Sequence, residues 1–110
     1  MNIFHDETLK MREFIEGVKV RFIHSENITL AEWDFAPGVI LPEHAHMNEQ
    51  ITKIISGEFE LIVDGEKIKL TAGSSVIIPS NSTHSGTSIT ACHIIDVFHP
   101  VRDDFKSYVE

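Results

Sequence analysis

Residues 38–50 read GVILPEHAHMNEQ, and they hold two histidines and a glutamine that are in phase with one another. In an extended chain, side chains two positions apart point to the same face of the strand. His44, His46 and Gln50 therefore share a face, while Ala45 points away from it. Two imidazoles and an amide oxygen on one face predict three ligands of a metal site. The alternative is a solvated loop that holds two incidental histidines.

A second segment, residues 73–84, reads GSSVIIPSNSTH and supplies the best candidate for a fourth ligand, His84. Each of the two segments lies beside a glycine turn, which suggests two related halves of the chain that close on one site. Glu49 is the alternative to Gln50, but it follows His46 by three positions and is out of phase with the histidine pair. Strand parity therefore favours Gln50 as the ligand.

Much of the remaining chain consists of short apolar or alternating runs between glycine and proline turns, as strands do. Strands are predicted at residues 18–25, 28–35, 50–57, 58–63, 66–70, 75–79 and 89–98. The run at 28–35 loses its apolar phase between Leu30 and Trp33, which predicts a bulge or burial on both faces. Many short strands of this kind indicate a sandwich or a barrel.

The clearest local pattern is the hairpin in residues 58–70, EFELIVDGEKIKL. Asp64-Gly65 is typical of a two-residue type I′ turn, because both central residues of that turn need a positive φ. This turn sets the register and places Leu61 opposite Ile68 and Phe59 opposite Leu70. Apolar residues then face apolar residues on one side of the hairpin.

The chain has 110 residues, of which 42% are apolar and 24% are charged, so one globular domain is expected. Its parts are a loosely structured lead-in at 1–16 with room for one helical turn, a β-barrel at 17–105, and a short polar tail at 106–110. Two aromatic residues lie near this end of the chain: Phe105, the last residue of the barrel, and Tyr108, in the tail.

The formal net charge of −8 argues against nucleic acid as a partner, because nucleic-acid binding needs a basic surface. No segment is apolar enough to span a bilayer, and no run is basic and amphipathic, so no membrane partner is expected. The first ten residues lack the pattern of a signal peptide. The single cysteine, Cys92, fits a reducing compartment, and we expect a cytoplasmic protein.

Together the two histidine segments resemble the paired motifs of the cupins, G-x5-H-x-H-x3/4-E and G-x5-P-x-G-x2-H-x3-N. The match covers six positions at the family's spacing: Gly38, His44, His46, Gly73, Pro79 and His84. The resemblance implies an all-β fold, the double-stranded β-helix or jelly-roll barrel, in a single domain. It also implies one divalent transition metal per chain, bound by His44, His46, Gln50 and His84.

Three positions depart from the cupin motifs: Gln50 replaces a glutamate, Asn81 a glycine and Ser88 an asparagine. Asn81 is a mild change, since asparagine tolerates the left-handed conformation better than most residues. Gln50 changes the electrostatics, because three imidazoles and an amide leave the double charge of the ion uncompensated. Such a site favours an anionic ligand and a Lewis-acid role, and it accepts zinc, nickel or iron.

The strand predicted at 89–98 places the carboxylate of Asp96 in an apolar run, two positions before Phe98 on the same face. A buried carboxylate is costly unless it is paired, and desolvation raises its pKa towards the range useful for proton transfer. Arg102 offers a planar fork that suits a carboxylate. The alternative is a structural ion pair between Asp96 and Arg102 across the turn at Pro100.

Residues 84–105, HSGTSITACHIIDVFHPVRDDF, resemble the C-terminal half of small bacterial cupins of the pectin-degradation type. Those proteins linearise unsaturated uronates, and their last strand ends in D-V-F-x-P-x-R-x-D-F. The resemblance gives Asp96 an acid/base role, Arg102 the substrate carboxylate, and Phe98 a wall of the sugar pocket. It implies a metal-dependent enzyme that converts a 4,5-unsaturated uronate, a small sugar acid, into its linear 5-keto-4-deoxy form, and a homodimer.

Two other functions fit the same motifs. Three-histidine iron sites activate oxygen in related folds, so one alternative is an iron-dependent dioxygenase. The other alternative is a non-catalytic binding or sensor module that a metal stabilises, because a fold alone does not establish catalysis.

Overall fold

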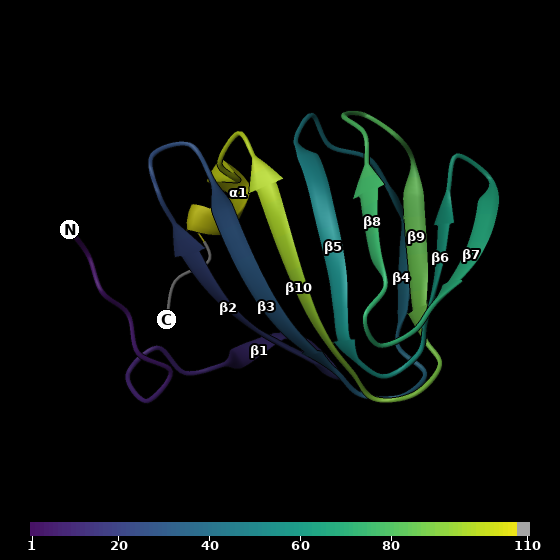
Figure 1. Cartoon of the computed structure of the whole chain (residues 1–110), viewed down its shortest axis with the longest axis horizontal. Coiled ribbons are helices and arrows are strands. Elements are labelled where there is room, and N and C mark those ends of the chain that lie inside the picture. Colours follow the sequence, from purple (N-terminus) through teal and green to yellow (C-terminus); the bar gives the residue numbers. More distant parts are fainter. Residues whose placement is uncertain (108–110) are drawn as a thin grey trace.

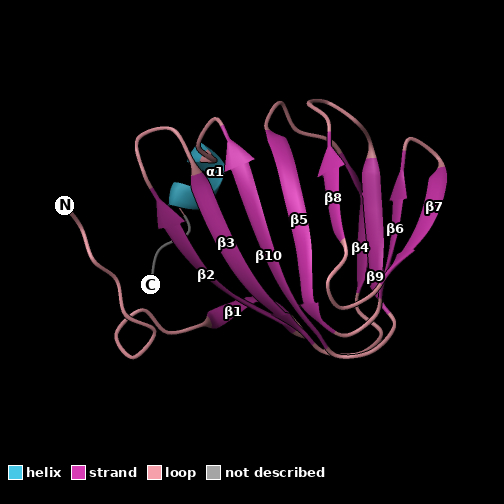
Figure 2. Ribbon diagram, in the orientation of Figure 1, coloured by secondary structure: helices cyan, strands magenta, loops and turns pink. Residues whose placement is uncertain are grey.

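A computed structural model describes residues 1–107 as an all-β molecule with one short helix (Figures 1 and 2). The elements are β1 (Arg12–Ile15), β2 (Val18–His24), β3 (Thr29–Phe35), β4 (Ile40–His44), β5 (Glu49–Ser56), β6 (Phe59–Val63), β7 (Glu66–Leu70), β8 (Ser75–Ile78), β9 (His84–Ser88), β10 (Cys92–His99) and α1 (Asp103–Lys106). One sheet has the order β1-β2-β3-β10-β5-β8, and the other has the order β4-β9-β6-β7. Every pair of neighbouring strands is antiparallel.

The predicted hairpin is present as β6 and β7, and its register is confirmed. Leu61 lies opposite Ile68, and Phe59 lies opposite Leu70. The two turn residues have positive φ values, 49° at Asp64 and 84° at Gly65, as a type I′ turn requires.

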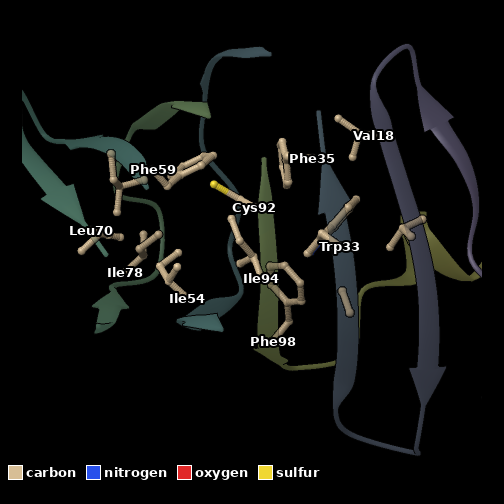
Figure 3. Close-up of a cluster of buried hydrophobic side chains, with 13 residues drawn as sticks. Val18, Trp33, Phe35, Ile54, Phe59, Leu70, Ile78, Cys92, Ile94 and Phe98 are labelled. Carbon is tan, nitrogen blue, oxygen red and sulfur yellow. The ribbon is translucent and has the colours of Figure 1, made fainter. Parts of the chain in front are cut away.

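The core lies between the two sheets and follows from the alternation along the strands. In β3 and β10 every second side chain is buried, so each strand sends one face inward and the other outward. Figure 3 shows the buried cluster, in which aromatic and aliphatic side chains from both sheets meet. The cluster includes Trp33, Phe35, Ile54, Phe59 and Ile94.

The expected irregularity at residues 28–35 is wrong. β3 pairs with both β2 and β10 without a register shift, and its buried positions alternate from Thr29 to Phe35. Leu30 lies on the outer face and is only partly buried, so the apparent slip in phase comes from an aliphatic residue on the outside of the sheet.

The lead-in at residues 1–16 is more ordered than the sequence suggested. The carbonyl of His5 accepts hydrogen bonds from the amides of Thr8 and Leu9, which forms a single turn. Residues 12–15 then form β1 on the edge of the larger sheet. Phe14, on this strand, packs edge-on against Trp33 with ring centroids 5.1 Å apart.

The C-terminal segment also packs on the barrel. β10 ends at His99, the His99–Pro100 peptide bond is cis, and α1 follows. Phe105 on this helix contacts the ring of Phe22 at 4.8 Å and the ring of Phe98 at 5.7 Å, so it belongs to an aromatic cluster. Tyr108 lies outside the described residues. Among residues 1–107, no helix is long and apolar enough to cross a membrane.

Candidate metal centre

The three histidines predicted as ligands converge from three separate places in the fold. His44 ends β4 and lies opposite His84, the first residue of β9, where a register shift interrupts the ladder between the two strands. His46 lies in the loop between β4 and β5. One ring nitrogen from each of the three lies within 4.8 Å of the others, so the triad could hold a metal ion.

A hydrogen bond to a backbone carbonyl fixes the ring orientation and the tautomer of each of these imidazoles. The Nδ1 atoms of His44, His46 and His84 lie 2.8, 3.0 and 2.9 Å from the carbonyl oxygens of Pro42, Asn48 and Ser82. A carbonyl oxygen only accepts, so Nδ1 carries the proton and Nε2 keeps a free lone pair. This arrangement is the usual one around metal-binding histidines, because it orients the ring and sets the tautomer.

Burial also keeps two of the rings neutral. Desolvation lowers the pKa of His84, and the nearby imidazoles contribute further in the same direction. Desolvation, followed by the charge of Arg102, lowers the pKa of His46. A neutral imidazole is the form that binds a metal.

Gln50, and not Glu49, lies beside the triad. The Gln50 side chain is buried in the pocket, whereas Glu49 is exposed. The Oε1 atom of Gln50 lies 3.1 Å from Nε2 of His46. Both atoms are acceptors in the orientation described, and a cation between them would satisfy both. The donor set, three nitrogens and one oxygen, therefore fits a divalent transition metal.

A chain of hydrogen bonds connects this ligand group to Asp96. The Gln50 amide donates to Oγ1 of Thr52 at 2.9 Å, and that hydroxyl donates to Oδ1 of Asp96 at 2.6 Å. The indole Nε1 of Trp33 donates to the other carboxylate oxygen at 3.0 Å. The sequence interpretation did not identify Thr52 as part of the site. The in-phase spacing of Gln50 and Thr52 on β5 was the one available signal for Thr52.

Asp96 is buried, and its pKa is raised to about 6. Desolvation is the main cause, and the hydrogen bonds from Thr52, Gln50 and Trp33 oppose it. The ion pair with Arg102 that was the alternative for this carboxylate does not form among the described residues. Asp96 is instead held on the pocket side of β10 by neutral donors.

Arg102 is buried and makes its ion pair with Asp104. Its Nε and Nη2 atoms donate to the two carboxylate oxygens at 2.9 and 2.7 Å. The guanidinium lies over the ring of Phe105 at 3.9 Å and over the ring of Phe98 at 4.8 Å. Asp104 and the two rings thus orient the guanidinium, while its Nη1 atom takes no part in the pair with Asp104.

All these groups border one cavity of about 360 Å³ between the sheets. The polar groups lie together on its wall: His44, His46, Gln50, Thr52, His84, Ser85, Asp96 and Arg102. Most of the remaining wall is aromatic or aliphatic, with Phe14, Trp33, Phe98 and Phe105 among the rings. A few convergent polar groups in a mostly apolar cavity are typical of a small-molecule site.

Comparison with known families assigns residues 31–98 to the cupin domain. The chain belongs to the cupin family. This cupin is 31% identical over 105 residues to the pectin degradation protein KdgF of Dickeya dadantii (strain 3937), a match that covers 93% of this chain and 96% of the relative. It is also 29% identical to the transcriptional regulator PuuR of Escherichia coli (strain K12), with 89% of this chain matched but only 56% of the regulator.

Solved structures agree with the fold of this cupin. KdgF from Halomonas sp. superimposes with a TM-score of 0.89 at 24% identity, covering 96% of this chain and 98% of the other. An RmlC-like cupin from Shewanella frigidimarina gives 0.90 at 28% identity, with 96% of both chains covered. The expected all-β cupin fold is confirmed. Asn81, at the family's glycine position, has a φ of 64°, as its tolerance of that conformation predicted.

Proposed function

We propose that this cupin is a metal-dependent enzyme that converts a 4,5-unsaturated uronate into its linear 5-keto-4-deoxy form. In this isomerisation the hemiacetal hydroxyl at C1 loses a proton, the bond between C1 and the ring oxygen breaks, and C4 gains a proton. No atom is added or removed. The similarity to KdgF, named as a pectin degradation protein, supports this substrate class, and we place the reaction in the cytoplasm.

The observation that carries the proposal is a buried carboxyl group on the cavity wall, Asp96, whose pKa is raised to about 6. Asp96 has a pKa of about 6, so near neutral pH it exists in both protonation states and can take up or release a proton. Thr52 and Trp33 hold its two oxygens by hydrogen bonds of 2.6 and 3.0 Å, which limits its movement during the transfer.

The ligand group defines the other side of the reacting centre. His44, His46, His84 and Gln50 would hold the metal, and when bound it would supply Lewis-acid polarisation of substrate oxygens. All four ligands are neutral, so the centre favours an anionic substrate.

Arg102 and Phe98 are the proposed binding residues. The guanidinium of Arg102 borders the cavity and is oriented by Asp104, so it would bind the substrate carboxylate through its remaining donors. Phe98 lies on the same face of β10 as Asp96 and presents its ring to the cavity beside His46, with centroids 5.6 Å apart. That ring would form a flat wall against the sugar.

The test follows the ultraviolet absorbance of the substrate's C4=C5 bond. Asp96→Asn and Asp96→Ala should slow its loss by a factor of about 10² to 10⁴, the usual contribution of a positioned acid or base. Asp34→Asn is a matched control, because Asp34 is exposed on the outer face of the same sheet. Equal rates in wild type and both Asp96 variants would remove Asp96 from the mechanism. Oxygen uptake during turnover would instead support the dioxygenase alternative.

A binding or sensor module is a second candidate, which the similarity to part of PuuR supports. The discriminating measurement is thermal melting of the metal-loaded protein with the uronate. A substrate that raises the melting temperature and is not consumed would favour a binding role over catalysis.

A further inference from the structure

Asn48 is a buried polar residue that the proposed reaction does not use. It lies in the loop between β4 and β5, between His46 and Gln50, and it is only 5% exposed. A buried side-chain amide needs hydrogen-bond partners, because burying it unpaired costs free energy. The partners of Asn48 lie in two different parts of the site.

The backbone of Asn48 holds a metal ligand. Its carbonyl oxygen accepts a hydrogen bond of 3.0 Å from Nδ1 of His46, which fixes the tautomer and the orientation of that ring. This contact uses a main-chain atom, so it does not depend on the side chain at position 48. On its other side the loop is joined to the segment before β9, where the Ser80 hydroxyl donates to the carbonyl of Met47 at 2.5 Å.

The side chain of Asn48 holds the segment that follows β10. Its Nδ2 atom donates to the carbonyl oxygen of Pro100 at 2.6 Å. The start of β5 and the end of β10 lie side by side at one end of the molecule, and their pairing reaches Glu49 and His99 (Figure 1). Pro100 has no amide hydrogen with which to continue the ladder. The Asn48 side chain therefore supplies the next hydrogen bond between the two segments.

The same segment carries Arg102, the proposed carboxylate-binding residue. The backbone amide of Arg102 donates to Oγ1 of the buried Thr29 at 2.9 Å. The segment is thus held at Pro100 and at Arg102, with only Val101 between them. The guanidinium is itself buried and packs over the ring of Phe98 at 4.8 Å, so a shift of the backbone would move it relative to the cavity.

We propose that Asn48 is a positioning residue for substrate binding: its side chain holds residues 100–102 so that Arg102 faces the substrate carboxylate, while its carbonyl holds His46 in the ligand group. One residue then connects the metal ligands with the carboxylate-binding residue. Asn48 does not border the cavity, so it acts through Arg102 and not on the substrate. This role rests on the proposed function, because it takes Arg102 as the group that binds the carboxylate.

The two contacts of Asn48 predict different effects when only its side chain is changed. Asn48→Leu has a similar size but cannot donate to Pro100, and Asn48→Ala removes the amide altogether. Both variants keep the backbone carbonyl that holds His46, so metal affinity should stay as in wild type. The loss of one hydrogen bond shifts an equilibrium by a factor of about 3 to 10, and carboxylate affinity should fall by about that factor.

The first test needs no substrate and uses the full chain saturated with zinc. Nuclear magnetic resonance measures hydrogen exchange of the Arg102 amide, which its hydrogen bond to Thr29 protects. Exchange should be faster in both Asn48 variants than in wild type. Ser80→Ala is the matched control, because it removes the contact on the other side of the same loop. Wild-type exchange of this amide in both Asn48 variants would overturn the proposal.

The second test compares galacturonate, a saturated uronate, with its methyl ester by isothermal titration calorimetry. Galacturonate has no C4=C5 bond and is not consumed, and the ester lacks the negative charge. Wild type and Ser80→Ala should bind the acid more tightly than the ester. The Asn48 variants should lose a factor of about 3 to 10 of that preference. A purely structural role would weaken both ligands equally, and that result would contradict positioning of Arg102.

The outcomes separate this proposal from the proposed function. Equal affinity of wild type for acid and ester, or no binding of either, would remove Arg102 from carboxylate binding and Asn48 with it. A preference for the acid that is the same in wild type and in the Asn48 variants would overturn the role of Asn48 alone. Metal affinity is measured by competition with a chromogenic chelator. A large loss in Asn48→Leu would show that the side chain supports the metal loop and not Arg102, and would contradict the proposal.

Discussion

Gln50 and Thr52 show how single residues connect the ligand group to the proposed acid. The Gln50 amide has two ends: its oxygen faces His46, and its nitrogen donates to the Thr52 hydroxyl, which in turn donates to Asp96. A glutamate at position 50 has no N–H to donate to that hydroxyl. The glutamine that departs from the cupin motif therefore donates a hydrogen bond to Thr52 that the family's glutamate could not donate.

Replacing Thr52 tests this connection. Thr52→Val keeps the shape of the side chain but leaves the Gln50 amide without its acceptor and Oδ1 of Asp96 without the hydroxyl donor, while Trp33 still donates to Oδ2. We expect metal affinity or turnover to fall by about 10- to 100-fold, as for other residues that orient metal ligands. Thr52→Ser is the control, because it keeps the hydroxyl. Affinity is measured by competition with a chromogenic chelator, and unchanged affinity and rate in Thr52→Val would contradict the role.

At the residue scale, strand parity distinguished Gln50 from Glu49, and the structure has Gln50 buried and Glu49 exposed. The premise that His44, His46 and Gln50 share one extended strand is wrong, because β4 ends at His44, His46 lies in the loop, and Gln50 belongs to β5 of the other sheet. Parity also placed Phe98 with Asp96. It could not find the contacts of Asp96 with Trp33 and Thr52, because these residues are 63 and 44 positions away and meet only after the strands pair.

Whole strands could be predicted where the local sequence carries both a turn signal and an apolar pattern. The hairpin of β6 and β7 was predictable because its turn and its apolar pattern agree. β4 and β9 were not predicted as strands, since ILPEH and HSGTS lack an apolar alternation. Their pairing with each other depends on distant parts of the chain, and that pairing brings His44 opposite His84.

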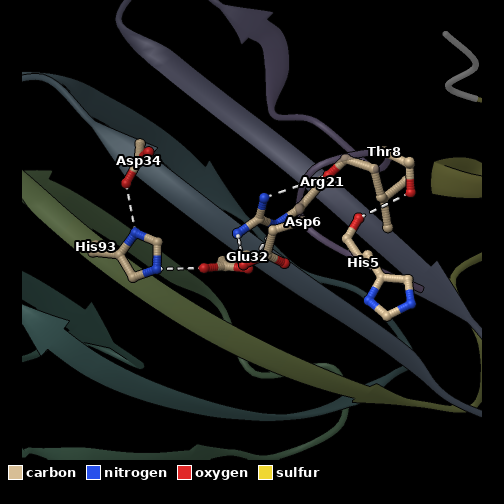
Figure 4. A network of polar contacts seen from close by, with 8 residues as sticks. His5, Asp6, Thr8, Arg21, Glu32, Asp34 and His93 are labelled. Carbon is tan, nitrogen blue, oxygen red and sulfur yellow. Dashed lines mark hydrogen bonds and ion pairs between the residues drawn. The ribbon is translucent and has the colours of Figure 1, made fainter. Parts of the chain in front are cut away.

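Strands β3 and β10 are also joined on their outer face by a histidine. The ring nitrogens of His93 contact Asp34 at 2.5 Å and Glu32 at 2.6 Å (Figure 4). Burial lowers the pKa of His93, but its hydrogen bonds to Asp34 and then to Glu32 outweigh that effect, so the net shift is upward from 6.5. The charged imidazole therefore stabilises the pairing of these two strands.

The pH dependence of this contact has a definite sign. A pKa that is raised on folding contributes stability fully below the unfolded value, near 6.5, and loses it as the pH rises through the folded value. His93→Gln should therefore lower the free energy of unfolding more at pH 5.5 than at pH 8.5. Urea unfolding of both proteins at one fixed concentration measures the difference. An equal loss at the two pH values would show that the charge on His93 contributes nothing.

At the scale of the whole molecule, the ligand group joins the two sheets. His44 and His84 belong to the smaller sheet, Gln50 belongs to the larger one, and His46 lies in the loop between them. A metal held by these four side chains would therefore cross-link the layers, and a ligand present at 1,000 times its Kd adds about 4 kcal/mol to the free energy of unfolding.

Removing the metal should lower the melting temperature of the whole domain. For a chain of this size, each kcal/mol of unfolding free energy corresponds to roughly 4–8 °C in melting temperature. Stripping the metal-saturated protein with a strong chelator should therefore lower the melting temperature by about 10 °C or more. His84→Ala should melt at a low temperature with or without the chelator, because it lacks one of the three imidazoles. His24→Ala is the control, since His24 hydrogen-bonds Thr29 and lies apart from the ligand group. Elemental analysis of the protein purified without added metal completes the test, and metal far below one ion per chain would contradict the site.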